Sequence, residues 1–400
     1  MRVHFETLGC KMNFADSEFA QHELQKMGFA ISDENPDFIV INTCTVTDTA
    51  DKKSRAKTNF FTRTGAQIVV TGCSTKISPD RWKTAFPGCA VCPTPADVVT
   101  FFSELSKPEP ETGFRIEPER TRKNIPIQTG CDTYCAYCII PFARGAAHSF
   151  SAKKIIDEIL EFEKTGGREI ILTGINLAAW GCSHTRKPEE SKFSELLAEI
   201  LEKTSIPRIR ISSIGPEYID DKFFEIFQNP RICDHLHVSV QSGSDTILKK
   251  MNRGHGTSEI SKLLKSARAV RPNAGFSCDV IVGFPGETDE LFRETVRQIR
   301  AWNFSKLHVF PFSARAGTVA AKMPNQISIE IKKQRSAELR KMGTEFRKKF
   351  IAAQIGKKQK VLWEKNGSGW TTNFLRVKNI SNVPENTISE LEISPEILVE

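Results

Sequence analysis

The sequence predicts an α/β protein in three parts: an N-terminal doubly wound parallel sheet, a central partial (β/α)6 barrel and a small C-terminal β-barrel. Two observations predict this fold class. Short apolar runs alternate with helical stretches along residues 1–105 and again along 125–313, which is the pattern of parallel strands joined by crossover helices. After residue 356 the apolar runs are short and separated by glycine-containing turns, which is typical of a small antiparallel barrel.

The N-terminal part contains three predicted strands with two predicted helices between them. The strands are at 2–8, 38–43 and 67–71, and the helices are at 16–28 and 48–63. A stretch at 107–122 is rich in proline and charge and has no apolar periodicity, so it predicts a domain boundary. We therefore expect domains at 1–106, 123–345 and 356–400.

Each of these three strands is followed closely by a cysteine, namely Cys10, Cys44 and Cys73. The carboxyl ends of parallel strands meet at one edge of a sheet, where open α/β folds bind ligands. One such cysteine alone is typical of a small buried apolar residue, but three at one edge predict a three-thiolate site for an iron–sulfur cluster. Cys89 and Cys92 are also close in sequence, but the proline after them predicts a turn, and we expect no ligand role for them.

The central part alternates six predicted strands with five predicted helices. The strands are at 125–130, 169–176, 208–215, 235–240, 276–284 and 306–312, and the helices are at 152–164, 191–203, 218–228, 257–269 and 288–302. Barrels of this kind bind ligands at the carboxyl ends of their strands. Polar and glycine-rich residues stand at these ends and are candidates for contacts with a nucleoside, although each can be an ordinary turn: Thr173, Gly174, Ser212, Gln241 and 283–286.

A loop after the first barrel strand carries Cys131, Cys135 and Cys138 within the string TGCDTYCAYCIIPFARG. Three thiolates leave a four-iron cluster one ligand short, and the open iron can bind a substrate. Structural zinc sites take four ligands from paired Cys-x-x-Cys units, so a zinc site or three simply buried thiols is the alternative interpretation. The remaining cysteines have no partner at motif spacing: Cys182, Cys233 and Cys278.

The net charge of +8 is concentrated at 331–360, which holds eleven lysines and arginines against two glutamates. A basic stretch of this density is typical of a surface that binds the phosphates of a nucleic acid. Its densest group, Arg347, Lys348 and Lys349, provides our candidates for RNA contacts. The alternative is the solvated face of a long helix, which we predict at 325–354.

Three aromatic residues follow this basic stretch: Trp363, Trp370 and Phe374. They could stack bases of a nucleic acid or form the core of the small C-terminal module. Eleven cysteines without a signal peptide or an apolar run long enough for a membrane predict a reducing cytoplasm and no membrane association.

The spacing of Cys131, Cys135 and Cys138, with an aromatic residue just before the last cysteine, resembles the signature of the radical S-adenosylmethionine (SAM) enzymes. The resemblance implies that the open iron binds the amino and carboxylate groups of SAM. It implies no catalytic side chain beyond the cluster ligands. The candidates for SAM contacts are Tyr137, Thr173, Gly174, Ser212 and Gln241.

The whole chain resembles one branch of these enzymes, the methylthiotransferases, which join an N-terminal three-cysteine domain, a radical SAM barrel and an RNA-binding TRAM domain. Within that branch, TLGCKMN, VINTCTVTDTADKKSR and HVFPFSARAGTVAAKMP look most like the MtaB type, which acts on threonylcarbamoyladenosine in tRNA. The sequence departs from the family at Gly215, where an acidic residue is usual. Its TRAM-like segment is also short and has GWTTNF in place of a tyrosine-richer pattern.

The resemblance implies two [4Fe-4S] clusters and a radical reaction. The cluster at Cys131, Cys135 and Cys138 would reduce SAM, and the resulting 5′-deoxyadenosyl radical would remove hydrogen from carbon-2 of the adenine at tRNA position 37. The cluster at the strand-end cysteines would hold the sulfur, which a second SAM methylates. The partners would be tRNA, an electron donor such as flavodoxin or ferredoxin, and a sulfur source. Arg144 and Arg253 are candidates to bind the threonyl carboxylate.

Three alternatives remain open. The branch also contains enzymes that act on isopentenyladenosine in tRNA and on an aspartate of a small-subunit ribosomal protein; the latter predicts a TRAM surface that is acidic or apolar, whereas this one is basic. A non-enzyme, an iron–sulfur RNA-binding module, would need fully ligated iron, and two sets of three cysteines argue against it.

Overall fold

The computed structural model describes residues 1–105 and 121–399. Within these ranges the chain forms two compact units. The first comprises the described part of Met1–Glu117 together with Cys138–Ala146 and Ser313–Thr318. The second comprises the described parts of Pro118–Tyr137, Ala147–Phe312 and Val319–Glu400.

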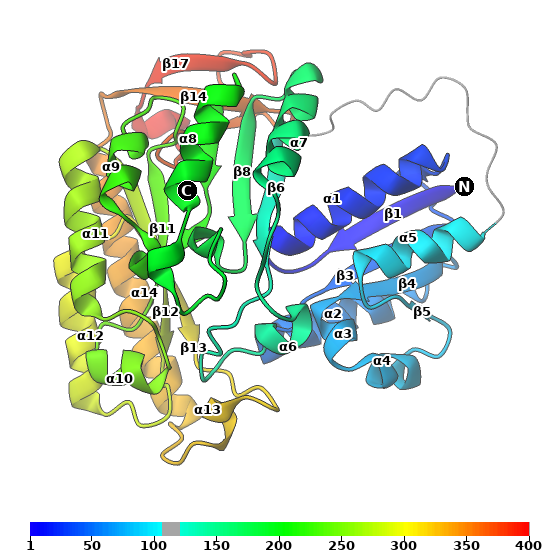
Figure 1. Ribbon diagram of the computed structural model, residues 1–400, viewed down its shortest axis with the longest axis horizontal. Coiled ribbons are helices and arrows are strands. Elements are labelled where there is room, and N and C mark those ends of the chain that lie inside the picture. Colours follow the sequence, from blue (N-terminus) through cyan, green and yellow to red (C-terminus); the bar gives the residue numbers. More distant parts are fainter. Residues whose placement is uncertain (106–120, 400) are drawn as a thin grey trace. The chain divides into compact units, whose positions relative to one another are not determined.

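The first unit is built on a five-stranded sheet in the order β2-β1-β3-β4-β5, in which every pair is parallel (Figure 1). The strands are β1 (Arg2–Thr7), β2 (Ala30–Ile31), β3 (Phe38–Thr43), β4 (Gln67–Gly72) and β5 (Ala90–Val91). The helices are α1 (Lys11–Lys26), α2 (Asp48–Phe61), α3 (Cys73–Ile77), α4 (Pro79–Ala85) and α5 (Pro95–Glu104). The predicted parallel sheet and its three main strands are thus confirmed.

The sheet of this unit carries apolar side chains on both faces, as a doubly wound fold requires. Alternate residues of its strands point to opposite faces, so Val40 packs with Leu24 and Phe102 from α1 and α5. On the other face Ile41 packs with Trp82 from α4.

Two expectations for this unit are wrong. Helix α1 begins at Lys11 rather than near residue 16, because its first turn buries Met12 and Asn13 and so shows no apolar periodicity in the sequence. Between Cys89 and Cys92 the chain forms strand β5 rather than a turn, because Val70 and Val91 pair in register at the edge of the sheet.

The second unit contains all six predicted barrel strands. The strands before residue 312 form two of the unit's sheets, β7-β6-β8-β9 and β10-β11-β12-β13. The third predicted strand is broken at Ser212 into β9, which pairs with β8, and β10, which pairs with β11. The bounds are β6 (Arg122–Thr129), β7 (His148–Ser149), β8 (Glu169–Gly174), β9 (Arg208–Ile211), β10 (Ser213–Ile214), β11 (His235–Gln241), β12 (Gly275–Val282) and β13 (Lys306–Pro311).

Helices cover one side of these strands (Figure 1). Leu236 and Val238 of β11 share a core with Leu263 of the covering helices. His237, which lies between these two strand residues, therefore faces the opposite side of the strands. The helices of this unit are α7 (Ala152–Lys164), α8 (Phe193–Lys203), α9 (Asp221–Phe227), α10 (Asp245–Lys250), α11 (Thr257–Val270), α12 (Asp289–Trp302), α13 (Val319–Lys322) and α14 (Ile329–Ala352), with 3-10 turns at Leu177–Ala179, Pro188–Glu190, Pro216–Tyr218 and Pro395–Ile397. Helix α6 (Ile140–Arg144) belongs to the first unit.

The C-terminal residues form a four-stranded antiparallel sheet in the order β16-β15-β14-β17. Its strands are β14 (Lys358–Glu364), β15 (Ser368–Thr371), β16 (Arg376–Lys378) and β17 (Ile388–Glu392). Trp363 is buried in its core with Val361 and Val377. No helix in the described ranges is both long and apolar enough to cross a bilayer.

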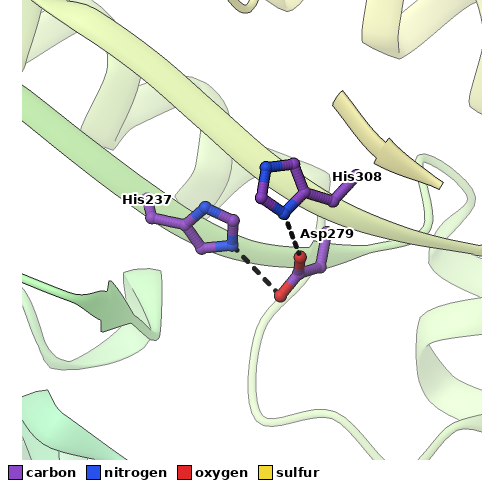
Figure 2. A group of neighbouring side chains, drawn as sticks. All are labelled: His237, Asp279 and His308. Atoms are coloured by element: carbon purple, nitrogen blue, oxygen red, sulfur yellow. Dashed lines mark ion pairs between the residues drawn. The ribbon is translucent and has the colours of Figure 1, made fainter. Parts of the chain in front are cut away.

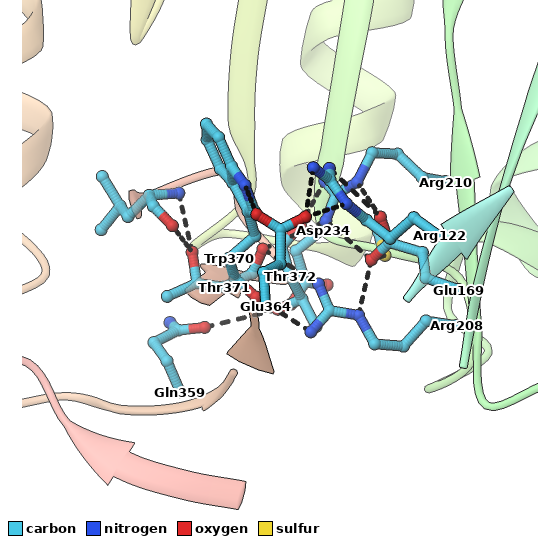
Figure 3. A network of polar contacts seen from close by, with 12 residues as sticks. Arg122, Glu169, Arg208, Arg210, Asp234, Gln359, Glu364, Trp370, Thr371 and Thr372 are labelled. Carbon is cyan, nitrogen blue, oxygen red and sulfur yellow. Dashed lines mark hydrogen bonds and ion pairs between the residues drawn. The ribbon is translucent and has the colours of Figure 1, made fainter. Parts of the chain in front are cut away.

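A buried charge network joins this sheet to the amino-terminal ends of the barrel strands (Figure 3). Glu169 is fully buried and accepts two hydrogen bonds from Arg210, at 3.0 and 3.2 Å. Arg210 also donates to the carbonyl of Thr372 at 3.1 Å, and Arg208 donates to that of Trp370 at 3.0 Å. Burial raises the pKa of Glu169, but Arg210 and Arg208 lower it more, so that it lies well below its ordinary value.

The same junction contains two of the three C-terminal aromatic residues. The ring of Phe374 stacks between His235 and Trp370, with its centroid 4.7 Å from each. With Trp363 in the core of the sheet, the structure supports the interpretation of these aromatics as structural residues rather than as platforms for bases.

Candidate functional site

The three strand-end cysteines of the first unit lie close together, two of them beside the same side chain. Cys10 caps the amino terminus of α1, Cys44 follows β3, and Cys73 begins α3. The thiol of Cys10 lies 3.5 Å from Asn13 Oδ1, and that of Cys73 lies 3.9 Å from the same oxygen. A Cβ atom on Gly9 would lie 3.0 Å from Cβ of Cys44. The three thiols therefore line one small site at the carboxyl edge of the sheet.

Two glycines allow the strand-end loops to approach this closely. Gly9 and Gly72 have φ angles of +117° and +98°, in the region that favours glycine. A Cβ atom on Gly72 would lie 2.3 Å from Oδ1 of Asn42. A larger residue at either position would force the cysteine loops apart.

The side chain of Asn13 holds the carboxyl ends of the strands together. Its amide nitrogen donates to the carbonyls of Leu8 and Thr43, both at 2.9 Å, and to Oδ1 of Asn42 at 3.1 Å. Asn42 donates in return to the carbonyl of Asn13 at 2.8 Å. Sequence reasoning missed Asn13, because an asparagine in a first helical turn is common and only its position beside Cys10 could have marked it.

Arg144 brings a positive charge to this cysteine site. One guanidinium nitrogen donates to Asn13 Oδ1 at 3.1 Å and to a carboxylate oxygen of Asp16 at 2.6 Å. Burial lowers the pKa of Arg144, but Cys73 and Asp16 raise it more, so that it lies above its ordinary value. These contacts argue against our expectation that Arg144 binds the threonyl carboxylate.

The thiols fit a metal cluster rather than disulfides. All eleven cysteines lie in the described ranges, and none of them forms a disulfide. Burial raises the pKa of Cys44, and it raises that of Cys73 to about 11, so that both thiols are neutral by themselves. Bound iron would supply the positive charge that deprotonates them, and the neighbouring guanidinium would offset part of the cluster's negative charge.

Cys131 and Cys135 lie in the loop after β6 in the second unit. The thiol of Cys131 donates to Oγ1 of Thr133 at 3.3 Å, and burial raises its pKa. Cys135 accepts a hydrogen bond from Arg253 at 3.3 Å. Cys138 begins Cys138–Ala146, a segment of the first unit, whereas Cys131 and Cys135 belong to the second unit.

Residues 251–253 support this cysteine loop. The amide of Ala136 donates to the carbonyl of Met251 at 2.9 Å, and the side chain of Asn252 donates to the carbonyl of Tyr134 at 3.0 Å. Arg253 itself also donates to the carbonyl of Ser239 at 3.3 Å. The guanidinium that we expected to bind a substrate carboxylate is thus placed against a cysteine sulfur.

The candidate SAM contacts lie at the carboxyl ends of the barrel strands. Thr173 and Ser212 are buried, and Gly174 lies so close to the chain that a Cβ atom would be 3.1 Å from the carbonyl of Gln128. Gln241 ends β11 with a φ angle of +68°. Tyr137 is partly buried against the cluster around Phe284. Their contacts with SAM stay a prediction.

Gly215, which stands where an acidic residue is usual in the family, lies beside the carboxylate of Glu217. A Cβ atom on Gly215 would lie 2.7 Å from Oε2 of Glu217, and the same oxygen lies 2.9 Å from Nδ1 of His255. Burial raises the pKa of Glu217, but His255 and Arg253 lower it more. An acidic group therefore occupies the space beside Gly215.

Helix α14 carries much of the basic stretch, but not every basic side chain on it is exposed and able to bind a phosphate. Arg335 is buried and pairs with Glu287 at 2.8 Å and with Asp289 at 2.7 Å. Arg347 is partly buried, and burial lowers its pKa. The exposed basic residues, which we call the basic stripe, are Lys333, Arg340, Lys341, Lys348, Lys349, Lys358 and Lys360.

Two family models match the chain. Residues 125–299 match the radical SAM superfamily, and residues 2–92 match a family described as uncharacterized protein family UPF0004. The first match contains Cys131, Cys135 and Cys138, and the second contains Cys10, Cys44 and Cys73.

Curated relatives match over most of the chain. The threonylcarbamoyladenosine tRNA methylthiotransferase MtaB of Thermotoga maritima is 34% identical over 388 residues, which cover 90% of this chain and 86% of the relative. A tRNA-2-methylthio-N(6)-dimethylallyladenosine synthase of Campylobacter jejuni is 34% identical over 389 residues, which cover 92% and 89%.

A solved structure shares the fold. The radical SAM methyltransferase TsrM of Kitasatospora setae, with cobalamin and a [4Fe-4S] cluster bound, has a TM-score of 0.55 and 15% identity over 78% of this chain and 74% of that one. At this identity the likeness concerns the fold alone.

Proposed function

Because the chain belongs to the radical SAM methylthiotransferase family, we propose that it adds a methylthio group to carbon-2 of threonylcarbamoyladenosine at position 37 of tRNA. The enzymes of this family are transferases that use SAM and [4Fe-4S] clusters. When bound, these cofactors supply the radical chemistry that replaces the hydrogen on carbon-2. The observation that carries the proposal is the presence of two separate three-cysteine sets in a chain that matches such enzymes along most of its length.

Each cysteine set has its own role in the proposal. Cys131, Cys135 and Cys138 would hold the cluster that reduces SAM, with Tyr137, Thr173, Gly174, Ser212 and Gln241 as the candidates to position SAM. Cys10, Cys44 and Cys73 would hold the auxiliary cluster that carries the sulfur. The approach of Cys10 and Cys73 to Asn13, with Cys44 beside Gly9, supports this assignment.

The chain's own side chains would tune and orient the clusters. Arg253 donates to the sulfur of Cys135, and Arg144 lies beside Asn13 in the other site. A guanidinium stays protonated at any physiological pH, so each would hold a fixed positive charge near iron-bound sulfur. Hydrogen bonds to cluster sulfurs are one of the factors that set the reduction potential of a cluster.

The basic stripe would hold the tRNA. Lysines and arginines bind a nucleic acid chiefly through its phosphates, and Lys348 and Lys349 are exposed for this purpose on α14. The target base would leave the stack of the anticodon loop to reach the barrel, as bases modified in loops must. Domains at 1–106, 123–345 and 356–400 would carry the auxiliary cluster, the radical chemistry and part of the RNA contact.

The choice of nucleoside is supported by the names of the relatives. Enzymes acting on threonylcarbamoyladenosine match at 32 to 34% identity. Enzymes named for dimethylallyladenosine match at 30 to 34%, so that substrate is the second candidate. The basic stripe does not favour a ribosomal protein as the substrate, because it complements phosphate groups.

Further partners follow from the chemistry. A reductant such as flavodoxin or ferredoxin would supply electrons to the first cluster, and a separate sulfur source would replenish the second. Eleven cysteines without a disulfide, together with the tRNA substrate, support a cytoplasmic location.

The test has two parts. Mass spectrometry of tRNA nucleosides from cells with and without the gene should show loss of the 2-methylthio derivative of threonylcarbamoyladenosine. Purified reconstituted enzyme should then add a methylthio group to tRNA carrying threonylcarbamoyladenosine. Turnover only on tRNA carrying isopentenyladenosine would overturn the nucleoside assignment, whereas failure to cleave SAM would overturn the radical chemistry.

A further inference from the structure

Three side chains on neighbouring barrel strands form a cluster that neither three-cysteine set uses. His237, Asp279 and His308 come from β11, β12 and β13, which pair in parallel and in this order (Figure 2). Asp279 and His308 are register partners. The apolar neighbours of Asp279 in the strand, Cys278 and Val280, pack in the core beneath the helices, so Asp279 faces the opposite side of the strands.

The ligand atoms of the three side chains face one another. Nε2 of His237 lies 3.0 Å from Oδ2 of Asp279, and Nδ1 of His308 lies 3.6 Å from Oδ1 of the same carboxylate. One donor atom of each residue falls within 4.8 Å of the others. Ligands about 2.0 to 2.2 Å from a common ion stand at comparable separations.

Hydrogen bonding fixes which nitrogen of His237 faces the carboxylate. Nδ1 of His237 lies 2.8 Å from Oγ of Ser277, and the same oxygen lies 3.0 Å from Nε2 of His235. Histidines that bind metals usually donate their second ring N–H to such a partner, which fixes the tautomer and the orientation of the ring. Ser277 stands in that position relative to His237.

The cluster is also accessible. The side chains of His237, Asp279 and His308 are 12%, 26% and 39% exposed, so an ion can reach them. Both imidazoles lie within ion-pair distance of the same carboxylate. Nδ1 of His308, at 3.6 Å, is too far from Asp279 for a hydrogen bond and faces the same point as Nε2 of His237.

We propose that His237, Asp279 and His308 bind one divalent first-row transition-metal ion. Two imidazoles and one carboxylate are ligands that Zn²⁺ and Fe²⁺ accept. Three protein ligands leave at least one coordination position open, and this position would take an oxygen donor from solvent or from a ligand in the barrel. The site uses none of the six cysteines and does not depend on the nucleoside that the enzyme modifies.

The test measures metal binding in the reconstituted enzyme under anaerobic conditions. The protein is dialysed against Zn²⁺, freed of loosely bound metal, and analysed for zinc and iron by mass spectrometry. Wild-type enzyme should retain about one zinc per chain, as one such site requires. Asp279→Asn and His308→Gln should each lose that zinc and keep the iron of the wild type.

Two further variants sharpen this test. Ser277→Ala removes no ligand but should weaken zinc binding by about 10 to 100-fold, the usual effect of losing a partner that orients a metal-bound histidine. His148→Gln, at an exposed histidine of β7, should bind zinc as the wild type does. Equal zinc in wild type and in Asp279→Asn would overturn the proposal, because zinc held by vacant cysteine sites would not depend on Asp279. Absence of retained zinc in the wild type would overturn it as well.

Discussion

The guanidinium of Arg253 donates a hydrogen bond to the sulfur of Cys135 at 3.3 Å. A fixed cation therefore lies against one of the three cysteines proposed to hold the SAM-reducing cluster. Arg144 has a matching place beside the auxiliary site, where it contacts Asn13 and Asp16. In each set one arginine thus lies where negative charge would accumulate on cluster sulfurs.

Replacing Arg253 by Gln should lower the reduction potential of the SAM-reducing cluster, because the reduced cluster loses a hydrogen bond from a charged donor. Such a bond contributes about 1.5 to 3 kcal/mol, which corresponds to roughly 60 to 130 mV for a one-electron couple. The measurement is a redox titration followed by electron paramagnetic resonance. Arg300→Gln, at an exposed position of α12, is the matched control. An unchanged potential in Arg253→Gln would show that the contact with Cys135 is not kept in the loaded enzyme.

The two cysteine sets should be separable by iron content and by partial reactions. Reconstituted wild type should contain about eight irons per chain, as two four-iron clusters require. Replacing Cys131, Cys135 and Cys138 by Ala should leave about half of the iron and abolish SAM cleavage. If that variant cleaves SAM, the assignment is wrong.

The complementary variant replaces Cys10, Cys44 and Cys73 by Ala. It should retain SAM cleavage and make no methylthio product, because the sulfur carrier is lost while the reducing cluster stays. Formation of product would exclude these three cysteines as the sulfur site. Cys89→Ala with Cys92→Ala, in the same unit, is the control and should keep full iron and activity.

Neutralising Arg347, Lys348 and Lys349 to Gln should weaken tRNA binding and reduce its dependence on salt. The slope of log affinity against log salt should flatten by about two to three units, since each lost phosphate contact removes roughly one. Lys262→Gln with Lys265→Gln, on the exposed side of α11, is the control. An unchanged slope would mean that this face of α14 is only solvated.

Phe374→Leu should affect stability and leave the salt dependence of tRNA binding unchanged. The ring stacks on His235 and Trp370 within the second unit, so its loss should cost about 0.5 to 1.5 kcal/mol for each aromatic pair. Thermal unfolding and tRNA titration measure the two effects. A large loss of tRNA affinity in a stably folded Phe374→Leu protein would favour base stacking instead.

Glu169→Gln should destabilise the second unit at neutral pH by about 3 to 5 kcal/mol, because Arg208 and Arg210 would stay buried without their counter-ion. The arginines hold the pKa of Glu169 below its ordinary value of 4.5. Its stabilising effect is therefore complete above pH 4.5 and is lost as the pH falls through the lower value of the folded state. The difference in unfolding free energy between wild type and variant should shrink in acid. A difference that does not change with pH would contradict this role.

Much of the fold could be predicted because most strands of the N-terminal sheet and of the barrel are short apolar runs with turns at their ends. Strands β3 and β13 begin where the apolar pattern begins. The start of α1 could not be predicted, since its first turn buries one apolar side chain, Met12, next to a polar one, Asn13, and so shows no apolar periodicity. The prediction also missed the break at Ser212, because polar residues and isoleucines are interspersed through 208–215 and the whole segment is typical of one strand.

The candidate sites were predictable to different degrees. Strand ends in a parallel sheet meet at one edge, so the approach of Cys10, Cys44 and Cys73 followed from their positions after strands. The partners of Arg144 did not, because α6 reaches Asn13 from a distant part of the sequence. To predict the cluster of His237, Asp279 and His308 one must know the register of three strands. The alternation of apolar residues alone does not fix that register.

The carbonyl groups of Trp370 and Thr372 accept hydrogen bonds from Arg208 and Arg210 of the barrel. A main-chain carbonyl accepts a hydrogen bond whatever the side chain of its own residue. The junction therefore depends on the path of the backbone after β14 more than on which residues form it. Exchanging the C-terminal sheet for that of a relative should therefore succeed only where the donor segment places its turn after β15 over these arginines. A shortened chain ending before β14 would leave both guanidinium groups and Glu169 facing water, and should be obtained in aggregated form rather than as a smaller soluble enzyme.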